Sequence, residues 1–90
     1  MHYEWDEEKA IANLRRHNID FADAVGIFDD PYAFSMPDAT PHEQRFAALG
    51  MDILGRILVV IYTHRGEWMR IISARCATPA ERGTYERGVI

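Results

Sequence analysis

Apolar residues at helical spacing open the chain. Ala10, Ile11 and Leu14 form one stripe, which predicts an amphipathic helix. Asp6 is a favourable N-cap, because its carboxylate accepts from the unpaired amides of the first turn. Asn18 is a favourable stop, because asparagine tolerates the left-handed conformation. We therefore predict a helix between these two residues, preceded by a short strand or extended lead over residues 3–5.

A second apolar stripe predicts a second helix. Its members recur at positions i, i+3, i+4 and i+7, and they are Phe21, Ala24, Val25 and Phe28. Asp20 caps this helix, and Asp29-Asp30-Pro31 ends it, because the residue before a proline avoids helical angles. Only two residues, Asn18 and Ile19, link the two helices, so we expect a helical hairpin.

From Tyr32 onward the apolar pattern is that of strands. The run from Arg56 to Thr63 is continuous and rich in β-branched residues, which indicates a strand buried on both faces. Arg65-Gly66-Glu67 is a tight connection suited to a hairpin. Four strands are predicted, over residues 32–36, 43–49, 56–63 and 68–76.

A last helix follows the strands. Thr78 and Glu81 have the spacing of a capping box, and Pro79 stands at the first helical position. The predicted fold class is therefore α+β, with two N-terminal helices packed on an antiparallel meander of about four strands and a C-terminal helix. We expect the opposite face of the sheet, or its rim, to be open to solvent or to a partner.

Length and cysteine content narrow the class of protein. The chain has 90 residues and one cysteine, Cys76, which predicts one domain over residues 1–90 and excludes an intramolecular disulfide framework. No apolar run approaches the roughly 20 residues of a membrane span. We therefore expect a cytoplasmic protein that has no contact with membranes.

Charge is distributed unevenly along the chain. Residues 1–45 carry ten acidic and four basic residues, and residues 46–90 carry four acidic residues and six arginines. Lys9 is the only lysine, so nearly all cations are guanidinium groups, which suit phosphate or carboxylate. The total net charge is −4. Composition alone does not choose between a nucleic acid and an acidic protein as the partner.

Groups that can perform acid–base chemistry gather in two places. One is the segment from His42 to Arg45, at the start of a predicted strand. The other is the strand from Arg70 to Arg75 with the side chains that follow it on the last helix, Glu81, Arg82 and Tyr85. Cleaving RNA without a metal needs a base, an acid and cations for the phosphorane, and such a cluster supplies these roles. No cofactor or metal site is expected, because the four histidines are scattered: His2, His17, His42 and His64.

Each of these residues can also have a purely structural role. Arg70 and Arg75 are five residues apart, so in an unbroken strand they point to opposite faces, and one of them can simply pair with an acid of the two N-terminal helices. Glu81 can serve only the capping box, Tyr85 can belong to the core, and His42 can be an idle loop histidine.

Motifs along almost the whole chain resemble one known family. The front half carries Glu4-Trp5-Asp6-Glu7-Glu8-Lys9-Ala10, Asn13 to Phe21, and Phe28-Asp29-Asp30-Pro31. The back half carries Glu43 to Gly50, Leu58 to Thr63, Arg70 to Arg75, Ala77-Thr78, Glu81-Arg82 and Tyr85. In this order they resemble the BrnT family of toxins. Two positions depart from the family pattern: Asn18 replaces a usual glycine, and Cys76 stands where a lysine is common.

The resemblance implies a ribonuclease toxin of a type II toxin–antitoxin system, with a RelE-like fold. It also implies RNA as substrate and a BrnA-like DNA-binding antitoxin as partner, so that DNA is contacted only through the antitoxin complex. We expect Arg45, Arg70 and Arg75 to contact phosphate, with Glu81, Tyr85 and His42 as acid, base or supporting groups. Arg82 and Arg56 are expected to add RNA contacts. The competing hypothesis is a catalytically weak or inactive module that only binds the antitoxin and tunes operon autoregulation.

Overall fold

Three α-helices, one 3-10 helix and five strands make up the part of the chain that the structure describes, residues 1–39 and 43–89 of a computed structural model. The helices and strands follow in this order: β1 (His2–Glu4), α1 (Glu7–His17), α2 (Phe21–Ala24), η1 (Val25–Asp29), β2 (Phe34–Asp38), β3 (Arg45–Met51), β4 (Ile57–Arg65), β5 (Trp68–Cys76) and α3 (Pro79–Val89).

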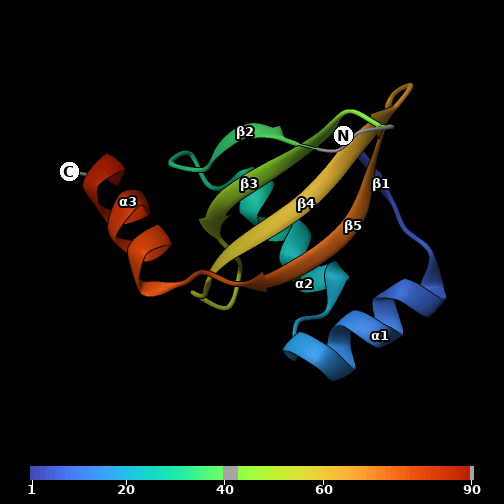
Figure 1. Cartoon of the computed structure of the whole chain (residues 1–90), viewed down its shortest axis with the longest axis horizontal. Helices are drawn as coiled ribbons and strands as arrows, with labels where there is room; N and C mark the ends of the chain where they lie inside the picture. The colour runs from blue at the N-terminus through green and yellow to red at the C-terminus, as the bar shows by residue number, and fades with distance from the viewer. Residues whose placement is uncertain (40–42, 90) are drawn as a thin grey trace.

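The five strands form one sheet in the order β1-β5-β4-β3-β2. Strands β2 to β5 pair antiparallel with their neighbours, so the predicted α+β class and four-stranded meander are confirmed. The predicted N-terminal lead is a fifth strand, which pairs in parallel with β5 through residues 68–70. Figure 1 shows this blue strand at the far edge of the sheet from β2.

Both predicted ends of the first helix are confirmed. The Asp6 carboxylate accepts from the Glu8 amide at 3.2 Å. Asn18 adopts the left-handed conformation, with φ of 58°. The second helix is shorter than predicted: Asp20 caps it at the Ala22 amide, but after one turn the chain tightens into the 3-10 helix η1.

The edge strand β2 begins and ends two residues later than predicted. Tyr32 is part of a turn, in which its amide donates to the Asp30 carboxylate at 2.9 Å. Pro37, the first residue after the predicted strand, lies inside β2. A proline has no amide hydrogen to donate, and an edge strand tolerates this because one side of its backbone has no strand neighbour.

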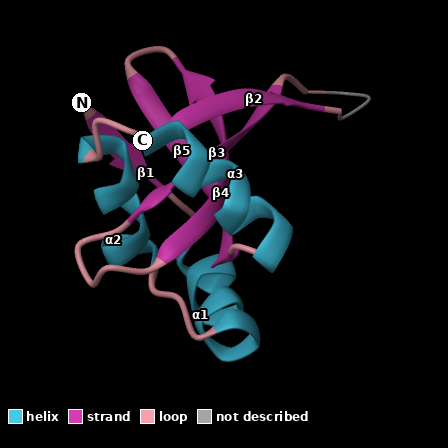
Figure 2. Cartoon of the chain, turned by 90° about the vertical axis from the view of Figure 1, so that its left-hand side faces the viewer, coloured by secondary structure: helices cyan, strands magenta, loops and turns pink. Residues whose placement is uncertain are grey.

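The two faces of the sheet are covered differently. One face packs against α1, α2 and η1, where Ile19, Phe21 and Ile27 are buried among residues of β4 and β5. Gly50 permits this packing, because a Cβ atom there would lie 2.8 Å from the Ala33 Cβ. The helix α3 leaves the end of β5 and lies apart from α1 (Figures 1 and 2). No helix of the described residues is long and apolar enough to cross a membrane.

Candidate functional site

A β-bulge decides which arginines share a face of the sheet. Tyr62 pairs with Ile71 and Ile61 pairs with Ser73, so Ile72 is an extra residue in β5. An extra residue restores the alternation that a spacing of five would otherwise break. Arg70 pairs with Thr63, and Arg75 pairs with Val59. Thr63 and Val59 are four residues apart in β4, so the two arginines lie on the same face of the sheet. The expectation that the two arginines of an unbroken strand point to opposite faces is wrong for this strand, because the strand is bulged.

Arg45 lies on the same face as these two arginines. The register of β3 on β4 pairs Phe46 with Tyr62, which sets Arg45 beside Thr63. Thr63 separates Arg45 from Arg70, two strands away at about 10 Å. We call this side of the sheet the open face. On β3, β4 and β5 its side chains are those of Arg45, Ala47, Leu49, Val59, Ile61, Thr63, Arg70, Ser73 and Arg75, and the edge strands add Glu4, Phe34, Met36 and Asp38.

Each arginine of the open face is paired with a carboxylate. The Arg45 Nε donates to Glu43 at 3.1 Å. Arg70 lies 3.7 Å from Glu4, its partner in the parallel pairing with β1. The three guanidinium groups remain partly exposed, at 31%, 27% and 41% for Arg45, Arg70 and Arg75. They are therefore accessible to an anion, but only in competition with an internal partner.

The tightest of these pairs joins Arg75 to Glu81. The guanidinium donates twice, at 2.7 Å from Nη1 to Oε1 and at 3.0 Å from Nη2 to Oε2. The same carboxylate accepts from the Thr78 amide at 2.8 Å, and the Thr78 hydroxyl accepts from the Glu81 amide, so the predicted capping box is confirmed. The Arg75 hydrogen bonds, with help from Thr78, outweigh burial and lower the pKa of Glu81 to about 2. Glu81 is therefore a carboxylate, not an acid, at neutral pH.

Tyr85 holds α3 onto the open face. Its ring is buried among Leu49 and Val59, with 5% of the residue exposed. Its hydroxyl donates to Asp30 Oδ2 at 2.6 Å. Burial, followed by this hydrogen bond to the charged Asp30, raises the pKa of Tyr85 to about 12. These contacts match the core alternative that the sequence left open for Tyr85.

Asp30 connects α3 to the rest of the chain. Besides Tyr85, it accepts from the Met51 amide at 2.8 Å and from the Tyr32 amide. Burial opposes its ionisation, but the three hydrogen bonds together lower the pKa of Asp30. A carboxylate that joins η1, β3 and α3 in this way is a structural anchor.

Two apolar hollows flank α3. The first, of about 220 Å³, lies against β2 and β3 and ends at Glu81; its lining includes Phe34, Met36 and Leu49. The second, of about 700 Å³, lies on the other side of the helix, where Arg82 faces Tyr32 and Asp30. Arg82 is therefore close to the Asp30 anchor of α3, and it lines a different hollow from Glu81.

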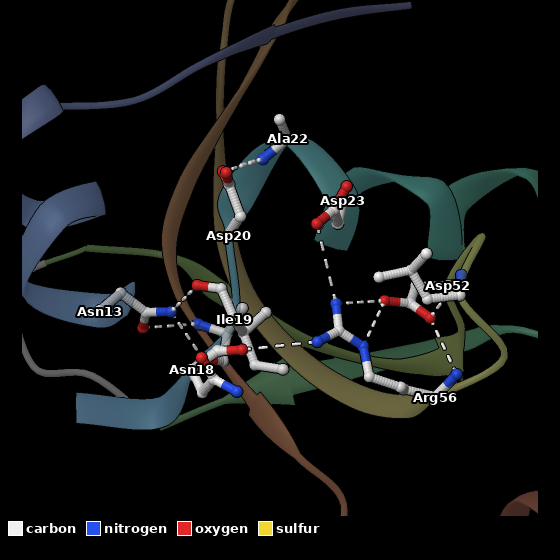
Figure 3. Close-up of polar contacts among 10 residues, drawn as sticks. Asn13, Asn18, Ile19, Asp20, Ala22, Asp23, Asp52 and Arg56 are labelled. Carbon is white, nitrogen blue, oxygen red and sulfur yellow. Dashed lines mark hydrogen bonds and ion pairs between the residues drawn. The ribbon is translucent and has the colours of Figure 1, made fainter. Parts of the chain in front are cut away.

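Arg56 lies away from the open face. Its guanidinium donates to Asp52 at 2.7 and 2.9 Å and to the Asn18 carbonyl at 3.4 Å, and Asp23 is 4.0 Å away (Figure 3). Asp52 is buried, so this pair fastens the β3–β4 turn beside the two N-terminal helices. His42 lies outside the described residues. Among the described residues, no group of three or more His, Cys, Asp and Glu side chains is placed to hold a metal ion.

The sequence analysis gave no role to three carboxylates of the site. Glu4, Glu43 and Asp30 each hold a side chain that we had singled out: Arg70, Arg45 and Tyr85. Glu43 stands two residues from its partner, so local spacing offered a signal. The other two partners depend on the pairing of β1 with β5 and on the docking of α3, which no local pattern reveals.

Comparison with known proteins agrees with the resemblance found in the sequence. The family model described as the ribonuclease toxin, BrnT, of a type II toxin–antitoxin system matches residues 5–81. The crystal structure of the Brucella abortus ribonuclease toxin, BrnT, is similar, with a TM-score of 0.65 and 28% identity over 87% of this chain and 99% of that one. No curated protein sequence matches the chain significantly. The chain thus belongs to the BrnT family of ribonuclease toxins of type II toxin–antitoxin systems.

Proposed function

We propose that this chain is an active, metal-independent endoribonuclease and that the open face carries its catalytic site. The observation that carries the proposal is the bulge at Ile72, which sets Arg70 and Arg75 on one face with Arg45. Guanidinium groups bind phosphate through paired N–H donors, and they stabilise the charge that develops on a phosphorane. Three guanidinium groups on one accessible face can therefore bind the phosphodiester that is cleaved.

The proposed reaction is an internal transesterification of RNA. A base removes the proton of the ribose 2′-hydroxyl, the 2′ oxygen forms a bond to phosphorus, and the bond from phosphorus to the 5′ oxygen breaks. An acid gives a proton to that leaving oxygen. The arginines stabilise the pentavalent phosphorane between these steps, and we propose His42, one of the three acid or base candidates from the sequence, as the acid.

Glu81 has a different role in this mechanism. A pKa of about 2 makes Glu81 a weak base and leaves it no proton to give at neutral pH. Its two oxygens occupy the donors of Arg75, which are the donors that a phosphate group would use. We assign Glu81 to holding Arg75 in place until the RNA phosphate displaces it. Tyr85 is assigned to holding α3 through Asp30.

The experiment is to express variants of the full chain alone and to follow growth and RNA integrity. Arg45→Ala and Arg70→Ala should each relieve growth inhibition and leave RNA intact. Arg15→Ala is the matched control, because Arg15 is exposed on α1, away from the open face. Circular dichroism checks that the variants fold. Full toxicity of both open-face variants at equal expression would refute the proposed site, and protection by Arg15→Ala would show that it is not specific.

Membership of the family implies an antitoxin partner. We propose that this partner is a BrnA-like DNA-binding protein, that it inhibits by covering the open face, and that DNA is contacted only through it in the cytoplasm. Co-expression of the neighbouring reading frame should then restore growth and protect RNA.

A second function is favoured by one specific observation. Each of the three arginines already has a carboxylate partner, and the chain has a net charge of −4, whereas affinity for nucleic acid usually depends on neutralising phosphates. A catalytically weak module that acts only through its antitoxin in operon autoregulation has these properties. Tight binding of the neighbouring gene product without toxicity or RNA degradation would support this module and contradict the enzyme.

A further inference from the structure

We propose that a second anion site, separate from the three arginines of the open face, binds a neighbouring phosphate of the RNA strand. This inference rests on the proposed function for its ligand. The site is a groove of about 190 Å³ between α1 and β5, which we call the edge groove; it is lined by Lys9, Ala12, Asn13, Arg16, His17, Ile72 and Ser73.

The basic side chains of the edge groove come from one face of α1. Lys9, Arg16 and His17 occupy positions i, i+7 and i+8, so the helix turns them in the same direction. No aspartate or glutamate is among the lining residues. Within the described residues, Lys9 and Arg16 form no ion pair, in contrast to Arg45, Arg70 and Arg75. An anion here would therefore meet cations without displacing an internal carboxylate.

Asn13 fixes the wall of the groove. It is buried, and its amide nitrogen donates to the carbonyls of Ile19 and Ala74 at 3.0 and 2.9 Å. Its oxygen accepts from the Ala74 amide at 3.1 Å. Figure 3 shows this side chain reaching from α1 to the chain near Ile19. These hydrogen bonds attach α1 to the edge of β5 at Ala74, the residue before Arg75. The attachment fixes the position of the groove relative to the open face.

The groove is continuous with the open face around the edge of β5. Strand β1 pairs only with residues 68–70 of β5, so among the described residues the edge of β5 that faces away from β4 has no strand partner from Ile72 onward. Ser73 lines the groove and also pairs with Ile61 on the open face. Ser73 and Arg75 are two residues apart, about 7 Å along the strand. An RNA strand with one phosphate at Arg75 can therefore pass over this edge and place a next phosphate between Lys9 and Arg16.

The test measures binding of a fluorescent, fully 2′-O-methylated single-stranded RNA to the purified full chain as salt is varied. Each phosphate contact on a single strand contributes about 0.7 to the slope of log affinity against log salt. The double variant Lys9→Ala/Arg16→Ala removes the contact to one phosphate, so it should lower the slope by about 0.7 and weaken binding several-fold at low salt. Lys9→Arg/Arg16→Lys should restore the slope, and Arg15→Ala on the same helix should leave it unchanged.

Three outcomes would overturn the proposal. The first is a well-folded double variant whose salt slope for RNA binding equals that of the parent. The second is an equal fall of the slope in Arg15→Ala. The third is a double variant that binds RNA normally but no longer binds the antitoxin, which would make the groove a protein-binding site. This RNA is not cleaved, so the result is independent of catalysis. Loss of cleavage in Arg45→Ala without any change in slope for the double variant would refute the edge groove while leaving the proposed function in place.

Discussion

Replacing Glu81 by glutamine separates its two roles. Glu81 pairs with Arg75 through both carboxylate oxygens, and it also accepts from the Thr78 amide at the start of α3. Glutamine keeps the second role, because its amide oxygen serves a capping box as a carboxylate does. It removes the charge that holds Arg75. We therefore expect Glu81→Gln to fold and to leave the Arg75 donors available to an RNA phosphate.

The pKa of Glu81 gives the expected size of the change in RNA affinity. A fall from 4.5 to about 2 is worth about 3 kcal/mol at 1.36 kcal/mol per pKa unit. Because Glu81 is 33% exposed and Arg75 is 41% exposed, solvent screening reduces the pair to about 1 kcal/mol. Removing a competitor of that strength should raise RNA affinity about fivefold, since 1.4 kcal/mol corresponds to a factor of ten.

The pH dependence of stability gives an independent check. The folded pKa of Glu81 lies below its unfolded value, so the pair stabilises the fold above pH 4.5 and is lost as the pH falls from 4.5 towards 2. Glu81→Gln should therefore be about 1 kcal/mol less stable than the parent at pH 7. This difference in the free energy of unfolding should shrink towards pH 2.

The assay measures affinity for 2′-O-methylated RNA by fluorescence anisotropy, and the free energy of unfolding by urea denaturation. Glu86→Gln is the control, because Glu86 is exposed on the same helix and its replacement changes the net charge equally. Weaker RNA binding in Glu81→Gln than in the parent would refute the idea that Glu81 competes with phosphate. An equal gain in Glu86→Gln would attribute the effect to net charge.

Three further substitutions test the packing around the site. Tyr85→Phe loses the hydrogen bond to Asp30 and should cost about 2 kcal/mol. Because the pKa of Tyr85 is raised from 10 to about 12, the parent should lose more stability than Tyr85→Phe in urea denaturation as the pH rises through this range. Equal pH profiles for the two proteins would contradict this role. Asn13→Ala leaves buried backbone groups unpaired and should lower the free energy of unfolding by about 2–3 kcal/mol, so a neutral result would refute the anchor. Gly50→Ala places a methyl group 2.8 Å from Ala33 and should cost about 1–3 kcal/mol, which an unchanged urea midpoint would exclude.

Local chemistry predicted the ends of the helices. The caps at Asp6, Asn18, Asp20 and Thr78 are all confirmed, because each depends on residues within one turn. The extent of the second helix was not predictable in the same way. Its apolar stripe is helical, but after one α-helical turn the chain continues as the 3-10 helix η1 against the sheet.

The arrangement of the candidate site depended on contacts that are distant in sequence. Spacing alone separated Arg70 from Arg75, and only the pairing of β4 with β5 reveals that Ile72 is an extra residue. The sequence also did not reveal that β1 runs parallel to β5 and brings Glu4 to Arg70. A bulge and an edge pairing are selected by the whole sheet, so a linear pattern does not encode them locally.

The proposed function depends on direct contact between the guanidinium groups of the open face and the RNA backbone. Side-chain Nε–H resonances of arginine, followed by NMR as 2′-O-methylated RNA is added, report this contact directly. We expect the resonances of Arg45, Arg70 and Arg75 to shift together until the RNA saturates the protein, while those of Arg15 and the Asp52-bound Arg56 stay in place. Saturable RNA binding that leaves the resonances of these three arginines unmoved would show that the open face does not contact the RNA backbone.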